Sequence, residues 1–142
     1  MRLQSNDYSC GPIAILNAYY YKYKCFPNVS LKKLCNRCLT NEEIGTERWN
    51  MNYNNIIDLG KGIYNKKSII EMSAFILLYS FGEKYAHYVF IERKKDKYFI
   101  YNYCDESSDN YMNVVKNKGE FEDLIRANPK VDELDYPFAW VV

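Results

Sequence analysis

The sequence is short of the features that mark several large functional classes. Its 142 residues carry a formal net charge of only +1 at pH 7, so no strongly charged surface indicates a nucleic-acid or membrane partner. No apolar run approaches the length that spans a bilayer, and Met1-Arg2-Leu3 precedes the first motif without a secretory signal. We therefore expect a cytoplasmic protein that binds neither nucleic acid nor membrane.

Repeats, low-complexity segments and linkers are also missing. The glycines of Gly60-Lys61-Gly62 fit neither a Walker loop nor a dinucleotide fingerprint, and we interpret them as the end of a helix. An apolar content of 48% argues against disorder. At this length, the sequence predicts a single domain over residues 1–142 with a hydrophobic core of its own.

The five cysteines are odd in number and scattered, which indicates reduced thiols rather than a disulfide framework. Cys35 and Cys38 form a CxxC pair, but zinc would need two further ligands. Neither Cys25 nor Cys104 is spaced to supply them. We interpret the pair as small apolar residues on a helix face, with a zinc or redox role as the alternative, and we expect no metal or cofactor.

The stretch from Gln4 to Pro12 contains the parts that a thiol hydrolase needs. A glutamine amide can donate a hydrogen bond to an oxyanion, and the Cys10 sulfur can attack a carbonyl carbon. Gly11-Pro12 suits the first turn of a helix, whose free N–H groups favour a thiolate at Cys10. The alternative is an ordinary buried cysteine at the start of a helix.

His87 is the only histidine, so it is the only imidazole that could act as a base for Cys10. A base also needs a partner for its other ring nitrogen. If the hairpin turns at Lys94-Lys95, Asn102 lies directly opposite His87, and another turn length makes them diagonal neighbours. Asp105 is the rival orienting residue.

The apolar spacing predicts helices in the first half of the chain and an antiparallel sheet in the second, an α+β fold. The expected helices are 11–23, a second from Leu31 to near Thr40, Asn50–Leu59 and Glu120–Ala127. The expected strands are Ser68–Met72, Phe75–Ser80, Ala86–Glu92, Lys97–Asn102 and Phe138–Val142, with a turn at Gly82.

The order Gln4, Cys10, His87, Asn102 resembles that of the papain-like cysteine peptidase superfamily. The pattern is most similar to the bacteriocin-processing and related minimal members, in which Cys-Gly-Pro/Ala opens the central helix. Those enzymes usually carry Asp-Pro where this chain has Asn102-Tyr103. SUMO-specific and adenovirus-type proteases place the histidine before the cysteine, so they do not fit.

This resemblance implies a papain-like fold with N-terminal helices packed on a C-terminal antiparallel sheet. It also implies a peptidase acting on peptide or isopeptide bonds of a protein or peptide substrate. The roles that it assigns are nucleophile for Cys10, base for His87, orienting amide for Asn102 and oxyanion donor for Gln4. Alternatives are a deamidase, a deubiquitinase or an acyltransferase on the same site, or a catalytically silent papain-like protein-binding module.

Overall fold

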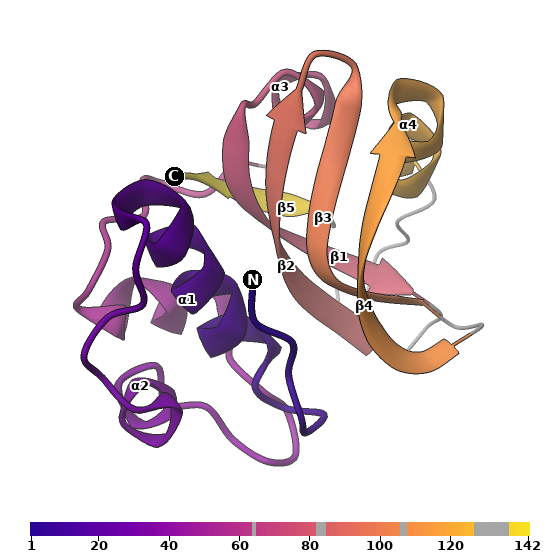
Figure 1. The fold of residues 1–142 in the computed structure, drawn as a ribbon. Coiled ribbons are helices and arrows are strands. Elements are labelled where there is room, and N and C mark those ends of the chain that lie inside the picture. Colours follow the sequence, from indigo (N-terminus) through magenta and orange to yellow (C-terminus); the bar gives the residue numbers. More distant parts are fainter. Residues whose placement is uncertain (64, 82–84, 106–107, 127–136) are drawn as a thin grey trace.

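A computed structural model describes residues 1–63, 65–81, 85–105, 108–126 and 137–142 of the chain. Its helices are α1 (Cys10–Tyr23), α2 (Leu31–Arg37), the 3-10 helix η1 (Arg48–Asn54), α3 (Lys66–Ile70) and α4 (Lys118–Arg126). Its strands are β1 (Ala74–Phe81), β2 (Tyr85–Lys94), β3 (Lys97–Asp105), β4 (Ser108–Asn117) and β5 (Phe138–Val141). The strands form one antiparallel sheet in the order β4-β3-β2-β1-β5, which confirms the α+β prediction (Figure 1).

Helix α1 is the centre of the N-terminal half. Its first nine residues are buried, including the apolar run from Ile13 to Leu16. A helix that is apolar on all sides must be enclosed on all sides, and α1 packs between the sheet and the other N-terminal helices (Figure 1). It ends at Lys24, which adopts a left-handed φ of 59° and donates its N–H to the Tyr20 carbonyl.

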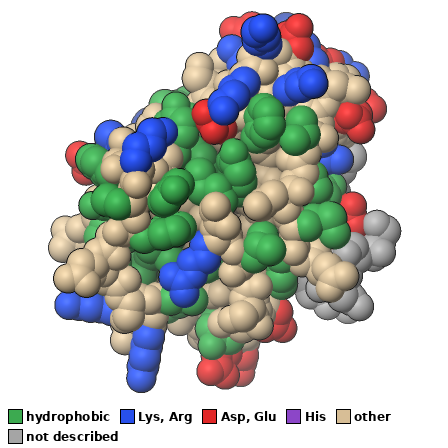
Figure 2. Space-filling model, viewed as in Figure 1, with side chains coloured by type: hydrophobic (Ala, Val, Ile, Leu, Met, Phe, Trp, Pro, Cys, Tyr) green, Lys and Arg blue, Asp and Glu red, His purple; other side chains and the backbone are tan. Residues whose placement is uncertain are grey.

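The two faces of the sheet carry separate hydrophobic clusters because side chains alternate along each strand. In β2, Tyr88 and Phe90 belong to the cluster that includes α1. Val89 and Ile91 belong to the opposite cluster, which includes residues of α3 and α4. Seen as in Figure 1, the surface carries charges of both signs around a centre that is mainly hydrophobic and uncharged (Figure 2).

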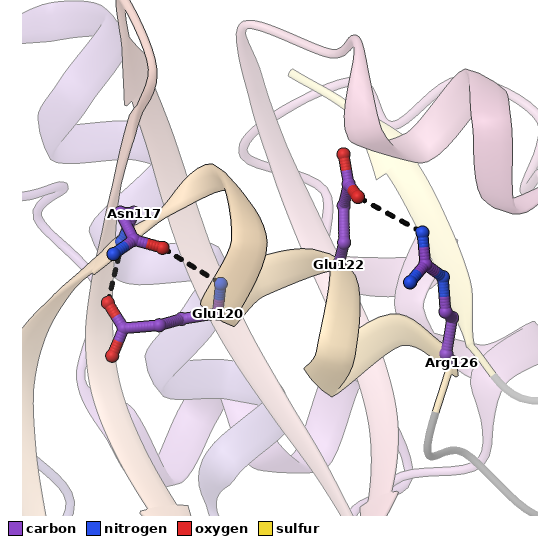
Figure 3. A network of polar contacts seen from close by, with 4 residues as sticks. All are labelled: Asn117, Glu120, Glu122 and Arg126. Carbon is purple, nitrogen blue, oxygen red and sulfur yellow. Dashed lines mark hydrogen bonds and ion pairs between the residues drawn. The ribbon is translucent and has the colours of Figure 1, made fainter.

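Helix α4 begins with a reciprocal cap. Asn117 Oδ1 accepts the Glu120 N–H at 2.9 Å, and Glu120 Oε1 accepts the Asn117 N–H at 3.0 Å (Figure 3). Glu122 and Arg126 pair one turn apart on the same helix. The helix expected at Glu120–Ala127 is thus confirmed, although its last residue, like the turn at Gly82, lies outside the described residues.

Two expectations for secondary structure are wrong, and one strand was not expected. Residues 68–72 were expected as a strand, but Asn65 caps helix α3 by accepting the Ser68 N–H at 3.1 Å. The helix expected over Asn50–Leu59 is the shorter η1, because the Asn54 side chain accepts the N–H groups of Ile56 and Ile57 and turns the chain. Strand β4 was not predicted, since its polar residues lie on an exposed edge.

The register of the β2–β3 hairpin also differs from the expected one. The turn lies at Lys95-Asp96, where Lys95 adopts a left-handed φ of 56°, and Lys94 pairs with Lys97. Regular pairing runs from Lys94 and Lys97 to Phe90 and Tyr101. His87 and Asn102 therefore are not opposite one another in a regular ladder.

Candidate active site

The side-chain amide of Asn102 makes two hydrogen bonds to Gln4, one to its backbone and one to its side chain. Asn102 Oδ1 accepts the backbone N–H of Gln4 at 2.9 Å, and Asn102 Nδ2 donates to Gln4 Oε1 at 2.6 Å. Gln4 Nε2 donates to the Asn6 carbonyl, also at 2.6 Å. Gln4 and Asn102 are 7% and 1% exposed, so these bonds replace those that water would otherwise make.

His87 is held by the same residue through a different atom. Its Nε2 lies 2.6 Å from the backbone carbonyl oxygen of Asn102. A carbonyl oxygen only accepts, so Nε2 carries a proton, and the neutral ring has its lone pair on Nδ1. The rings of Tyr79 and Tyr111 lie 5.7 and 5.6 Å from the imidazole, centroid to centroid.

A β-bulge turns the Asn102 carbonyl toward His87. Asn102 adopts a left-handed φ of 69°, and the β3–β4 register shifts between Ile100 and Tyr103. Asn113 of β4 supports the bulge by accepting the Asn102 N–H on Oδ1 at 3.1 Å. Asparagine tolerates positive φ better than most residues. Asn102 thus contacts His87, as expected, but by its backbone carbonyl rather than by its side-chain amide.

The rival orienting residue, Asp105, lies at the end of β3. Its Oδ2 accepts a hydrogen bond from the Tyr103 hydroxyl at 3.3 Å. The backbone carbonyl of Asn102 is the group that contacts Nε2 of His87.

Cys10 is the first residue of α1 and is 7% exposed. Backbone hydrogen bonds from Tyr88, Gly11 and Cys10 itself to the sulfur favour the thiolate, but burial outweighs them and raises the pKa of Cys10 to about 11. Burial likewise lowers the pKa of His87 to about 4, although the Asn102 contact raises it. Burial therefore favours the neutral thiol and the neutral imidazole, against the thiolate that the helix terminus alone would favour.

One contact places Cys10 beside the His87 segment. Its sulfur accepts a hydrogen bond from the backbone N–H of Tyr88, the residue that follows His87. Burial raises the pKa of Tyr79 and of Tyr111, whose rings lie next to the His87 ring. The direct approach of the Cys10 sulfur to a His87 ring nitrogen stays a prediction.

The chain from residue 40 to 46 closes against the start of α1. Tyr88 donates its hydroxyl proton to the Thr46 carbonyl at 2.7 Å, and Thr46 Oγ1 lies 2.7 Å from Thr40 Oγ1. A Cβ at Gly11 would stand 2.9 Å from Thr46 Oγ1 and 3.1 Å from Met51 Sδ. Gly11 is therefore required by the close approach of this loop.

Sequence reasoning missed Tyr79 as part of this region. Its hydroxyl donates to the Cys104 carbonyl at 2.5 Å, and its ring stands edge-on to His87. Tyr79 pairs with His87 across β1 and β2. A hairpin between the two apolar runs on either side of Gly82 would have been the signal, but the turn length that sets this register could not be read from the residues.

Among the described residues no cluster of three or more His, Cys, Asp or Glu side chains could hold a metal ion. Cys35 and Cys38 are free thiols, as are the other three cysteines. Within the same part of the chain, no helix is both long and apolar enough to cross a membrane.

No family model and no curated protein matches the sequence. A solved structure does match: the peptidase domain of Streptococcus ComA, described as a bi-functional ABC transporter involved in a quorum sensing pathway. The superposition has a TM-score of 0.66 and covers 99% of this chain and 96% of that one, at 15% sequence identity. The chain therefore has the papain-like peptidase-domain fold that the resemblance implied.

Proposed function

We propose that this protein is a papain-like cysteine peptidase that cleaves peptide bonds of a protein or peptide substrate. The observation that carries the proposal is the buried chain of hydrogen bonds from Gln4 through Asn102 to His87, beside Cys10 at the start of α1. A cysteine that only packs in the core would not require these hydrogen bonds. The solved structure with the same fold is a peptidase domain, which favours peptidase chemistry for this protein as well.

In the first step, His87 Nδ1 removes the thiol proton while the Cys10 sulfur bonds to the substrate carbonyl carbon. The carbonyl oxygen takes the electron pair and becomes an oxyanion. The second N–H of Gln4 Nε2 and the backbone N–H of Cys10 are the donors for this oxyanion. One such donor contributes about 10²–10³ in rate in other hydrolases.

In the second step, the carbon–nitrogen bond breaks and the His87 imidazolium protonates the leaving amine. A thioester then joins the acyl group to Cys10. Water attacks this thioester while Nδ1 takes its proton, the carbon–sulfur bond breaks, and the sulfur regains its proton from the imidazolium. Because thiol and imidazole start neutral, this route needs no preformed ion pair.

A substrate panel tests the proposal. Peptides, ubiquitin conjugates and glutamine-containing proteins are incubated with wild type and with Cys10→Ala, and products are identified by mass spectrometry. The proposal expects new peptide termini with wild type and none with Cys10→Ala. Cys25→Ala is the matched control. It removes an exposed thiol just after the C-terminal end of α1, and this variant should be fully active.

Other outcomes of the panel assign the site differently. Release of ammonia without chain cleavage would make the protein a deamidase, and release of ubiquitin would make it a deubiquitinase. No turnover of any substrate, together with no labelling of Cys10 by a peptide-derived electrophile, would overturn the enzyme proposal in favour of a binding module.

A further inference from the structure

We infer that the Asn102 side chain positions the oxyanion glutamine, Gln4, and does not orient His87. This inference rests on the proposed function, because it assigns a task within that site. It follows from the atoms involved: the amide of Asn102 is engaged by Gln4 twice, and His87 is held by the Asn102 backbone carbonyl.

The hydrogen-bond directions along this chain are determined from both ends. The backbone N–H of Gln4 is a donor, so the atom of Asn102 facing it is Oδ1. Nδ2 is then the atom that faces Gln4, so Gln4 presents Oε1 to it. Gln4 Nε2 consequently points to the Asn6 carbonyl, which can only accept. One orientation of both amides satisfies all three contacts.

This arrangement gives Gln4 a fixed rotamer before substrate arrives. One Nε2 proton is bound to the Asn6 carbonyl, and the other is the proton available for an oxyanion. Donors held in place in advance stabilise the transition state without reorganising at the moment of reaction. Asn102 acts here as a positioning residue, because it touches Gln4 and not the reacting atoms.

The chemistry distinguishes asparagine from aspartate at this position. An aspartate would orient an imidazole as well as an asparagine does or better. It has no proton to donate to Gln4 Oε1, however, and reversing the Gln4 amide would set its Oε1 against the Asn6 carbonyl. Either way two acceptors face each other in a buried site, which is costly. The inference therefore expects Asn102→Asp to be impaired.

Asn102→Gly is the cleanest variant, since glycine adopts a positive φ freely and keeps the backbone carbonyl that holds His87. Asn55→Gly is its matched control, because exposed Asn55 also has a left-handed φ, of 62°, and lies outside the site. Turnover of the substrate found in the panel and alkylation of Cys10 at pH 8 are measured for each variant. Alkylation forms no oxyanion but still requires the Cys10 thiol to lose its proton, the step in which the proposed function makes His87 the base, so it reports on that pair.

We expect Gln4→Ala to lower kcat by about 10²–10³, the range typical of an oxyanion donor, with little change in KM. Asn102→Gly and Asn102→Asp should each lower kcat by at least about tenfold, and the double variant of Gln4→Ala with Asn102→Gly should be no slower than Gln4→Ala alone. Alkylation should stay at the wild-type rate in all of these and fall in His87→Ala. Asn55→Gly should match wild type in both assays.

Three results would overturn the inference: full additivity of the two substitutions, normal activity of Asn102→Asp, or loss of Cys10 alkylation in Asn102→Gly. Loss of alkylation in Asn102→Gly would show that the Asn102 side chain acts through His87.

An NMR measurement separates failure of this inference from failure of the proposed function. The Asn102 side-chain amide signals should shift in Gln4→Ala whether or not any substrate turns over, and unchanged signals would refute the pairing.

Discussion

The imidazole of His87 is neutral in the folded chain because it is buried. Its pKa is about 4 when folded, below the usual 6.5, so the unfolded chain binds a proton in this interval that the folded chain does not. The contribution of His87 to stability is therefore complete above pH 6.5 and is lost as the pH falls toward 4. The loss should be on the order of 3 kcal/mol.

Urea unfolding of wild type and His87→Gln between pH 4 and 7 measures this effect. The glutamine keeps an N–H donor for the Asn102 carbonyl but does not titrate. Wild type should lose more free energy of unfolding toward pH 4 than the variant loses. Parallel pH profiles for the two proteins would mean that His87 is not buried as a neutral ring.

The thiol of Cys10 should react slowly with a simple alkylating reagent near neutral pH. With a pKa of about 11, roughly one molecule in 10⁴ carries the thiolate at pH 7. Iodoacetamide labelling followed by peptide mass spectrometry should therefore modify exposed Cys25 well before Cys10. The Cys10 rate should rise steadily from pH 7 to pH 10. A plateau in Cys10 labelling already at pH 6 would contradict this and show the thiolate that the helix terminus alone would favour.

At this scale the sequence indicates which residues are candidates for the site, but not which of their atoms make the contacts. Cys10, His87, Asn102 and Gln4 could be selected because a lone histidine and a Gln-x5-Cys spacing leave few choices. Which atom of Asn102 meets His87 depends on a bulge and a positive φ, and nothing in the residue types of β3 marks where a bulge falls. Burial of Cys10, which reverses the expected direction of its pKa, is likewise a property of the packed molecule.

The start of α1 depends on how closely the 40–46 loop approaches it. An alanine at position 11 would bring its Cβ within 3.1 Å of Thr46 and Met51 atoms, closer than ordinary contact. Overpacking of this kind costs about 1–3 kcal/mol. Gly11→Ala should therefore lower the midpoint of thermal or urea unfolding, and it should lower activity because the loop lies beside Cys10.

Gly60→Ala is the control for that experiment. No heavy atom lies within 4 Å of a Cβ placed at Gly60, and its φ is not in the left-handed region. Its free energy of unfolding should stay within a few tenths of a kcal/mol of wild type or rise slightly. Equal destabilisation by the two alanines would show that crowding at Thr46 is not the reason for Gly11.

Helices and strands with strong local signals were predictable as elements. Gly11-Pro12 followed by an apolar run indicated α1, and clean alternation indicated β2 and β3. The apolar residues of 68–72 are compatible with a strand, and it is the Asn65 cap ahead of them that makes this segment the helix α3. Strand β4 carries no clear apolar alternation, because most of its side chains from Asn110 to Asn117 are exposed.

At the scale of the whole molecule, the N-terminal segment around Gln4 lies against Asn102 of strand β3. Gln4 and Asn102 are 98 positions apart and meet only because α1 packs on the sheet and the N-terminal segment returns along it. Asn17 of α1 holds that segment by two hydrogen bonds with the backbone of Arg2. No local signal in the sequence predicts such contacts.

Trapping of the acyl-enzyme tests the central claim most directly. Wild type is mixed with an activated peptide ester, quenched in acid within a single turnover and digested, and the site of any acyl adduct is read by mass spectrometry. We predict a thioester on Cys10 in wild type, slower formation in Gln4→Ala and His87→Ala, and none in Cys10→Ala. An adduct confined to exposed Cys25, or no adduct on Cys10 while the substrate is consumed, would contradict Cys10 as the nucleophile.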